Sequence, residues 1–154
     1  MMLRAVLMTL LVAALYPAPA AAHGYTAGDL QVRHPWARAT PAGVAVAAGY
    51  LEIRNSGQQP DRVVGASTPA AERVEFHVQV QEGDVLKMRE VKDFGVPARQ
   101  RLTLRPGGSH LMLIGLKQPL VKGGRMPLTL RFERAGELQI ELEVQPVDSR
   151  KPHH

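Results

Sequence analysis

The sequence predicts an all-β domain, an antiparallel Greek-key sandwich or barrel. Three observations point to this fold class. Eight or so short runs of alternating or continuous apolar residues lie between Leu30 and Val144. Glycine, proline and asparagine separate these runs at short intervals, which is typical of turns between strands. No run combines the length and the 3.6-residue apolar spacing of a helix, so helical and α/β classes are not expected.

The expected strands follow one another along this region, and turn residues end each of them. They cover residues 30–36, 44–54, 62–66, 73–81, 85–91, 101–104, 110–113, 126–132 and 138–144. Pro35 marks an edge position or a bulge in the first strand, and Trp36 is expected to anchor the core. Gly49 is expected to allow a close backbone approach in the second. Residues 93–97 are expected to form a loop, and Met126 to lie in the core.

Residues 1–22 have the charge, hydropathy and cleavage signal of a secretory signal peptide. Arg4 supplies the positive start, an apolar run follows it, and residues 20–22 offer a small-residue cleavage site. The apolar run is shorter than the ~20 residues that a membrane-spanning helix needs. We therefore expect an exported protein without a stable membrane span. It would consist of one domain over residues 23–146 and a flexible polar tail over residues 147–154.

The composition excludes several classes of function. The 154 residues contain no cysteine, which excludes disulfides and thiolate metal ligands. Removing the signal peptide leaves 19 − 1 = 18 basic residues against 14 acidic ones, a net charge of +4 that is dispersed along the chain. Such a charge gives no support for nucleic-acid binding. No nucleophile–base set or acid pair at a recognisable spacing stands out, so we do not expect an enzyme.

Two histidines and two methionines form the most informative pattern of the chain. Ten residues separate His77 from Met88, and twenty-one more lead to His110, with Met112 two positions further on. The strand around His77 alternates, which places this side chain on the face away from the core. A hairpin with its two-residue loop at 82–83 would place Met88 directly opposite His77. His110 and Met112 share one face of their strand, so the two pairs are expected to converge on one metal ion.

The donor set favours copper(I). Thioether sulfur is neutral and polarisable, so it binds Mg²⁺ and Ca²⁺ poorly, and two methionines would be unusual ligands for zinc. Cu(I) suits imidazole and thioether donors, and a site without an anionic ligand favours this monovalent ion over Cu(II). A blue-copper centre requires a cysteine, which the chain lacks. The sequence therefore predicts an exported Cu(I)-binding protein.

The same residues carry a resemblance to a known family. The motif H(M)-x10-M-x21-H-x-M of the PCu(A)C copper chaperones matches His77, Met88, His110 and Met112. Val78 stands where some members have a methionine. The resemblance covers nearly the whole mature domain and implies a cupredoxin-like fold in the periplasm. It also implies delivery of copper toward the CuA centre of cytochrome c oxidase, with that oxidase subunit and a Sco-like thiol protein as partners.

Two other functions and two further metal sites stay open. The same ligands would serve a periplasmic copper buffer or resistance protein without a dedicated acceptor. Cleavage after Ala22 would expose His23, whose α-amine and imidazole could chelate Cu(II), and the second alternative is a copper oxidase or monooxygenase that uses this N-terminal site. His153 and His154 in the tail form either a secondary Cu(II) site or no site at all.

Overall fold

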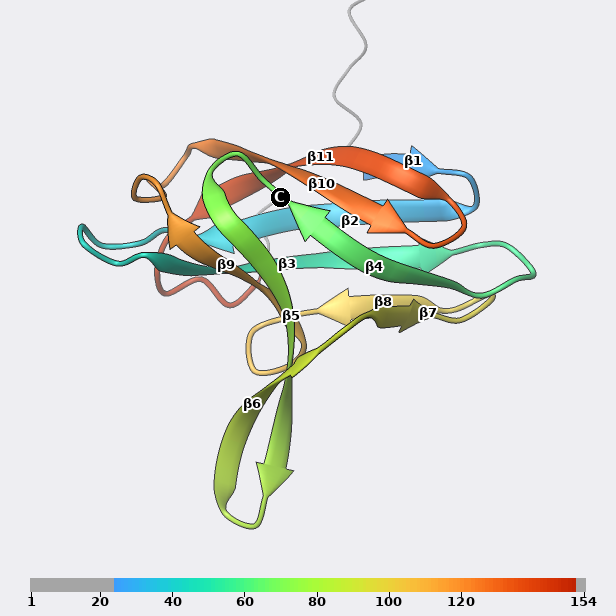
Figure 1. Cartoon of the computed structure of the whole chain (residues 1–154), viewed down its shortest axis with the longest axis horizontal. Coiled ribbons are helices and arrows are strands. Elements are labelled where there is room, and N and C mark those ends of the chain that lie inside the picture. Colours follow the sequence, from blue (N-terminus) through green and yellow to red (C-terminus); the bar gives the residue numbers. More distant parts are fainter. Residues whose placement is uncertain (1–23, 152–154) are drawn as a thin grey trace, which may run out of the picture.

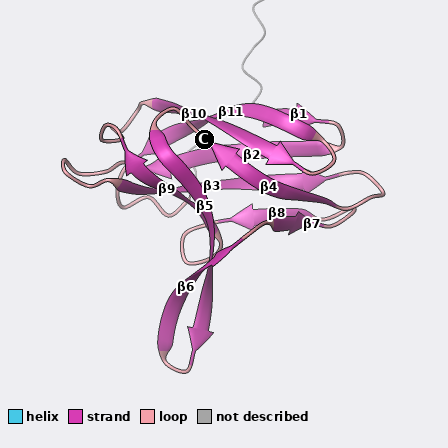
Figure 2. Cartoon of the chain, viewed as in Figure 1, coloured by secondary structure: helices cyan, strands magenta, loops and turns pink. Residues whose placement is uncertain are grey.

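The computed structural model of the protein describes residues 24–151. This part of the chain contains strands and no helix (Figure 2). The eleven strands found in it are β1 (Gly24–Ala27), β2 (Leu30–Arg38), β3 (Val46–Asn55), β4 (Asp61–Ser67), β5 (Ala71–Glu82), β6 (Val85–Val91), β7 (Phe94–Val96), β8 (Arg101–Leu104), β9 (His110–Leu116), β10 (Arg125–Phe132) and β11 (Gly136–Gln145). The predicted all-β class is confirmed. No helix in the described range is long and apolar enough to cross a membrane.

The strands form one mixed sheet. Their order is β6-β5-β9-β3-β2-β11-β10-β4-β7, with β1 also paired to β2 and β8 to β3. The pairing of β11 with β2 is parallel, which corrects the purely antiparallel arrangement that the sequence predicted. The other pairs are antiparallel. Side chains alternate with the same period in both kinds of pair, so the apolar pattern does not reveal the direction of a neighbouring strand.

The core is built from the apolar residues that alternate along the strands. Trp36 and Met126 are 3% and 2% exposed, so both predicted core positions are confirmed. At Gly49, a β-carbon would come within 3.3 Å of Leu142 Cδ1 and 3.6 Å of Leu111 Cβ. A side chain at this position would require Leu142 to shift by a few tenths of an ångström, whereas its distance to Leu111 is an ordinary contact. Both neighbours are side chains, so the predicted close approach of backbone stays a prediction.

Local details both confirm and correct the predicted strands. The pairing of β2 with β3 shifts register between Arg33 and Trp36, so the predicted bulge at Pro35 is confirmed. The predicted loop over residues 93–97 is wrong, because Phe94–Val96 forms β7 and pairs with β4. The strand β1 is an additional element that the sequence did not indicate.

The first residues of the C-terminal tail contact the domain. Ser149 is 6% exposed, and its carbonyl oxygen accepts a hydrogen bond of 3.0 Å from Arg38 Nε. The predicted signal peptide over residues 1–22 lies outside the described residues, as do His23 and residues 152–154.

Candidate metal centre

The centre is built on the neighbouring strands β5 and β9. In their antiparallel register, His77 lies opposite His110 and Glu75 lies opposite Met112. The centroids of the two imidazole rings are 5.6 Å apart. Leu111 is fully buried on the opposite face, so the predicted same-face arrangement of His110 and Met112 is confirmed. The sheet thus brings three of the four predicted ligands to one face through a long-range pairing that local spacing does not reveal.

The fourth predicted ligand lies on β6, and its predicted register is wrong. The hairpin pairs Met88 with Gln79 and Glu90 with His77, because its two-residue loop begins at Gly83, one position later than predicted. Gly83 has φ 61°, as the first loop residue of a type II′ turn requires. The later loop shifts the pairing by two residues, so Met88 keeps the face of His77 and becomes its diagonal neighbour. Diagonal neighbours have Cβ atoms roughly 7 Å apart, which a long thioether side chain can bridge.

The four side chains differ strongly in exposure. His110 is 4% exposed and the His77 side chain 16%, whereas Met88 is 56% exposed on a hairpin that extends away from the body of the domain (Figure 1). Met112 is half-buried, and neither it nor Met88 belongs to the core cluster. The imidazole end is covered, and the centre is open on the side of Met88.

Each imidazole makes a hydrogen bond through one ring nitrogen. His77 Nε2 lies 2.8 Å from Glu75 Oε2, and His110 Nδ1 lies 3.0 Å from the carbonyl oxygen of Gly108. Two buried atoms on this face of β5 have no hydrogen-bond partner: His77 Nδ1 and Gln79 Oε1. Buried polar atoms are normally paired, so these two acceptors are able to take a donor or a cation. A metal ion bound by His77 Nδ1 would supply the missing partner.

Aromatic residues pack behind His110. The Tyr50 ring lies 6.4 Å from the His110 ring and 4.6 Å from the Trp36 ring, between centroids. Burial raises the pKa of the Tyr50 phenol, and the positive charge of Arg38 partly opposes this rise. The phenol is therefore neutral at physiological pH. The sequence reasoning did not connect Tyr50 with the centre, because the contact depends on the pairing of β3 with β9.

Glu75 is a second residue whose role the sequence reasoning missed. Its Oε1 accepts a hydrogen bond of 2.8 Å from Arg73 Nε, while Oε2 faces His77. Two hydrogen bonds hold the pKa of the Glu75 carboxyl below its usual range. The bond from Arg73 contributes most, and the bond from His77 comes second. The carboxylate therefore stays ionised. The signal in the sequence was its place two residues before His77 in an alternating strand, which puts both on one face.

The environment of His110 favours the neutral imidazole. Burial lowers its pKa below the ordinary value of 6.5. The hydrogen bond with the Gly108 carbonyl opposes this shift, and a positive charge on His77 adds to it. Since neutral histidine is the form that binds metals, His110 remains a competent ligand at a lower pH than a free imidazole would.

We expect the free energy of unfolding of the apo protein to fall as the pH drops below 6.5, the ordinary pKa of histidine. The unfolded chain then takes up a proton on His110, whereas the folded protein does so only at a lower pH, so protonation favours unfolding. The loss ends once the pH is below the folded-state pKa. Urea unfolding at a series of pH values measures this effect. The variant His110→Asn should flatten this part of the profile, and an unchanged slope in that variant would contradict the role of His110.

Histidines and carboxylates alone do not build a metal site here. Within residues 24–151, no group of three or more His, Cys, Asp or Glu side chains could hold a metal ion. An ion at His77 and His110 must therefore use another ligand type, and Met88 and Met112 offer thioethers on the same face. This donor chemistry fits a soft ion. The remaining predicted ligands lie outside the described residues: His23, His153 and His154.

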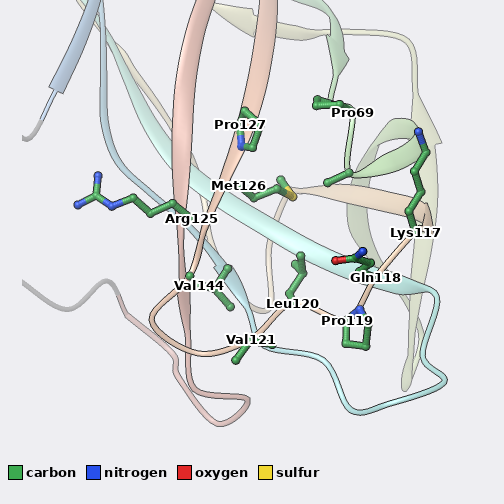
Figure 3. A pocket seen from close by; sticks show the side chains of 12 residues that line it. Pro69, Lys117, Gln118, Pro119, Leu120, Val121, Arg125, Met126, Pro127 and Val144 are labelled. Carbon is green, nitrogen blue, oxygen red and sulfur yellow. The ribbon is translucent and has the colours of Figure 1, made fainter.

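An apolar cavity of about 430 Å³ lies at the other end of β9 (Figure 3). Its lining includes Leu120, Met126 and Pro127 and contains no histidine. His110 is the first residue of β9 and Lys117 follows the last one, so the strand separates Lys117 at the cavity from His110 by about 23 Å at 3.3 Å per residue. The cavity is therefore distinct from the candidate metal centre.

Fold and site together define an all-β domain that presents two imidazoles and two thioethers on one face of its sheet. Solved domains of this kind are similar to the chain. The PCuAC domain of PmoF2 matches in its apo form with a TM-score of 0.72 and 32% identity, over 83% of this chain and 98% of that one. Its copper-bound form matches with a TM-score of 0.71 and 31% identity, over 81% and 99%. CuI-DR1885 from Deinococcus radiodurans matches with a TM-score of 0.60 and 32% identity, over 72% and 74%.

The chain belongs to the family described as "Putative lipoprotein LpqE-like", whose model matches residues 30–144. A relative, "Putative lipoprotein Lxx21020" of Leifsonia xyli subsp. xyli, is 37% identical over 129 residues, which cover 83% of this chain and 76% of the relative. The predicted resemblance to PCuAC-type copper chaperones is confirmed at the level of the domain by the matched structures.

Proposed function

We propose that this protein is an exported chaperone that binds one Cu(I) ion through His77, Met88, His110 and Met112 and passes it to an acceptor. The observation that carries the proposal is the pairing of His77 with His110 beside a buried ring nitrogen that has no partner. Imidazole and thioether donors suit Cu(I). The matched PmoF2 domain is copper-bound in one structure and DR1885 carries CuI, which supports this choice of metal.

The uneven exposure of the ligands suits transfer of the ion. Met88 is exposed on the hairpin, whereas His110 is buried. A ligand of the acceptor can therefore displace the Met88 thioether first, while the imidazoles still hold the ion. An anionic thiolate binds Cu(I) more strongly than a neutral thioether, so the ion moves toward a thiolate acceptor. In this proposal copper is a cargo, and the protein is a carrier rather than an enzyme.

The proposal places this transfer in the periplasm. Support for export comes first from the signal-peptide pattern of residues 1–22. The names of the family and of the relative also contain the word lipoprotein. The 154 residues themselves contain no cysteine. The proposed acceptor is the subunit of cytochrome c oxidase that carries the CuA centre, with a Sco-like thiol protein as co-worker. Both partners are what the resemblance to the PCu(A)C copper chaperones implies, and a thiol partner suits the donor chemistry because a thiolate binds Cu(I) more strongly than a thioether.

The mature protein is expected to bind one equivalent of Cu(I) far more tightly than Zn²⁺, because two thioethers discriminate against the harder ion. Competition with a coloured Cu(I) chelator under reducing, oxygen-free conditions, with and without excess zinc, measures this preference. Zinc that displaces copper on equal terms would show that the centre is not a soft-metal site.

The same titration with Cu(II) tests the two ends of the chain. If His153 and His154 form a Cu(II) site, deleting residues 150–154 removes a second, Cu(II)-selective equivalent and spares the Cu(I) equivalent. One extra residue before His23 displaces the α-amine and tests the N-terminal site in the same way. If neither change alters the Cu(II) stoichiometry, both ends are passive.

A transfer assay separates a chaperone from a copper buffer. The Cu(I)-loaded protein is mixed with the apo form of the CuA-bearing subunit, with and without the Sco-like protein, and copper is followed in each after separation. Direct transfer that is faster than release to a chelator supports the chaperone. Copper that reaches the acceptor only at the rate of free release identifies a buffer without a dedicated acceptor.

A further inference from the structure

The hydrogen bonds of the two histidines leave a different nitrogen free on each ring. Carboxylate and carbonyl oxygens only accept hydrogen bonds, so the ring nitrogen that faces one of them carries the hydrogen. His77 therefore holds its hydrogen on Nε2, 2.8 Å from Glu75 Oε2, and its lone pair on Nδ1. His110 holds its hydrogen on Nδ1, 3.0 Å from the Gly108 carbonyl, and its lone pair on Nε2. A neutral histidine binds a metal through the nitrogen with the lone pair.

The surroundings of His77 agree with this assignment. Its Nδ1 atom is buried and has no hydrogen-bond partner, and Gln79 Oε1 on the same face of β5 shares this condition. An unpaired buried acceptor opposes folding. The unpaired atom lies on the ring that faces His110, with 5.6 Å between the ring centroids. A cation between the rings would pair with this atom and with Nε2 of His110 together.

We infer that Cu(I) is bound through Nδ1 of His77 and Nε2 of His110, and that Glu75 is the positioning residue that keeps the lone pair of His77 on Nδ1. This inference rests on the proposed function and adds to it the ligand atoms and the residue that selects them. Arg73 Nε holds the other carboxylate oxygen at 2.8 Å, so Glu75 is fixed from both sides. Carboxylates in such positions fix the ring of a metal-binding histidine and raise its basicity.

The variant Glu75→Gln should reverse the tautomer of His77. The one oxygen of the glutamine amide accepts the hydrogen bond from Arg73, which leaves the amide NH₂ facing His77 Nε2. This NH₂ donates, so Nε2 must offer its lone pair and the hydrogen moves to Nδ1. Copper can then bind His77 Nδ1 only after the hydrogen has left that nitrogen. We expect the Cu(I) affinity to fall about 10–100-fold, the range found when a partner of a metal-binding histidine is removed.

Glu90→Gln is the matched control. Glu90 lies directly opposite His77 on β6 and is exposed, and no hydrogen bond joins it to His77 in the described structure. The substitution removes the same charge from the same neighbourhood and leaves the tautomer of His77 unchanged. We expect little change in Cu(I) affinity. An equal loss of affinity in both variants would identify charge alone as the cause and would overturn the positioning role of Glu75.

Long-range ¹H–¹⁵N correlation spectra of the histidine rings, recorded on the apo and Cu(I)-loaded protein, read the assignment directly. The apo spectra should show hydrogen on Nε2 of His77 and on Nδ1 of His110. In the Glu75→Gln variant, the hydrogen of His77 should lie on Nδ1 instead. Binding of Cu(I) should then shift the ¹⁵N resonances of His77 Nδ1 and His110 Nε2. Copper bound at Nε2 of His77 would overturn this inference alone. A parent protein that binds no Cu(I) would overturn the proposed function, and its apo spectra would still decide the tautomers.

Discussion

Met126→Ala is expected to lower the free energy of unfolding by about 2–5 kcal/mol, the usual effect of truncating a buried methionine, and to leave the Cu(I) affinity unchanged. Met126 is 2% exposed and belongs to the core cluster. It also lines the apolar cavity at the end of β9, so the truncation enlarges a space that already exists instead of allowing the core to close. Urea unfolding measures the first effect, and chelator competition measures the second.

Met88→Ala is the matched control and should show the opposite behaviour. Its side chain is 56% exposed on β6, so its truncation should change the unfolding free energy by no more than about 0.5 kcal/mol. The same truncation removes a proposed ligand and should weaken Cu(I) binding. A large loss of stability in this variant would place Met88 in the core. A loss of copper affinity in Met126→Ala would show that the two methionines were assigned to the wrong roles.

What the sequence could predict of the centre was local. Residues two apart on a strand share a face, so the joint orientation of His110 and Met112 followed from their spacing alone. By the same rule, the predicted face of Met88 is correct although the predicted turn position is not. A loop that begins one residue later shifts each pair by two, and a shift of two keeps every side chain on its face. The register was wrong, but the face of Met88 was right.

What the sequence could not predict was long-range. The pairing that sets His77 opposite His110 joins two strands far apart in the chain, and no local pattern selects one partner strand among several. The parallel contact of β11 with β2 was missed for the same reason. The strand β7 was missed because three residues with a central glycine resemble a turn. The hydrogen bond from His77 Nε2 to the Glu75 carboxylate requires a side-chain geometry that alternation alone does not give.

His77→Phe is expected to abolish tight Cu(I) binding and yet to change the stability of the apo protein little. A phenyl ring has a shape similar to that of an imidazole and removes Nδ1, the buried atom without a partner. Leaving such an atom unpaired costs about 1–3 kcal/mol, which offsets the loss of the hydrogen bond to the ionised Glu75, worth about 1.5–3 kcal/mol. The affinity for Cu(I) should fall by more than about 100-fold, because a direct ligand matters more than the partners behind it.

His110→Phe supplies the contrast for stability. The His110 ring is 4% exposed, and its Nδ1 is bonded to the Gly108 carbonyl, so this substitution breaks a satisfied hydrogen bond and relieves no unpaired atom. It should destabilise the apo protein by about 1–3 kcal/mol and also abolish tight copper binding. Urea unfolding and chelator competition on both variants measure the two effects. If His77→Phe proved the more destabilising of the two, His77 Nδ1 would have a partner in the apo protein. The unpaired nitrogen could then no longer be read as a position kept for the metal at the expense of stability.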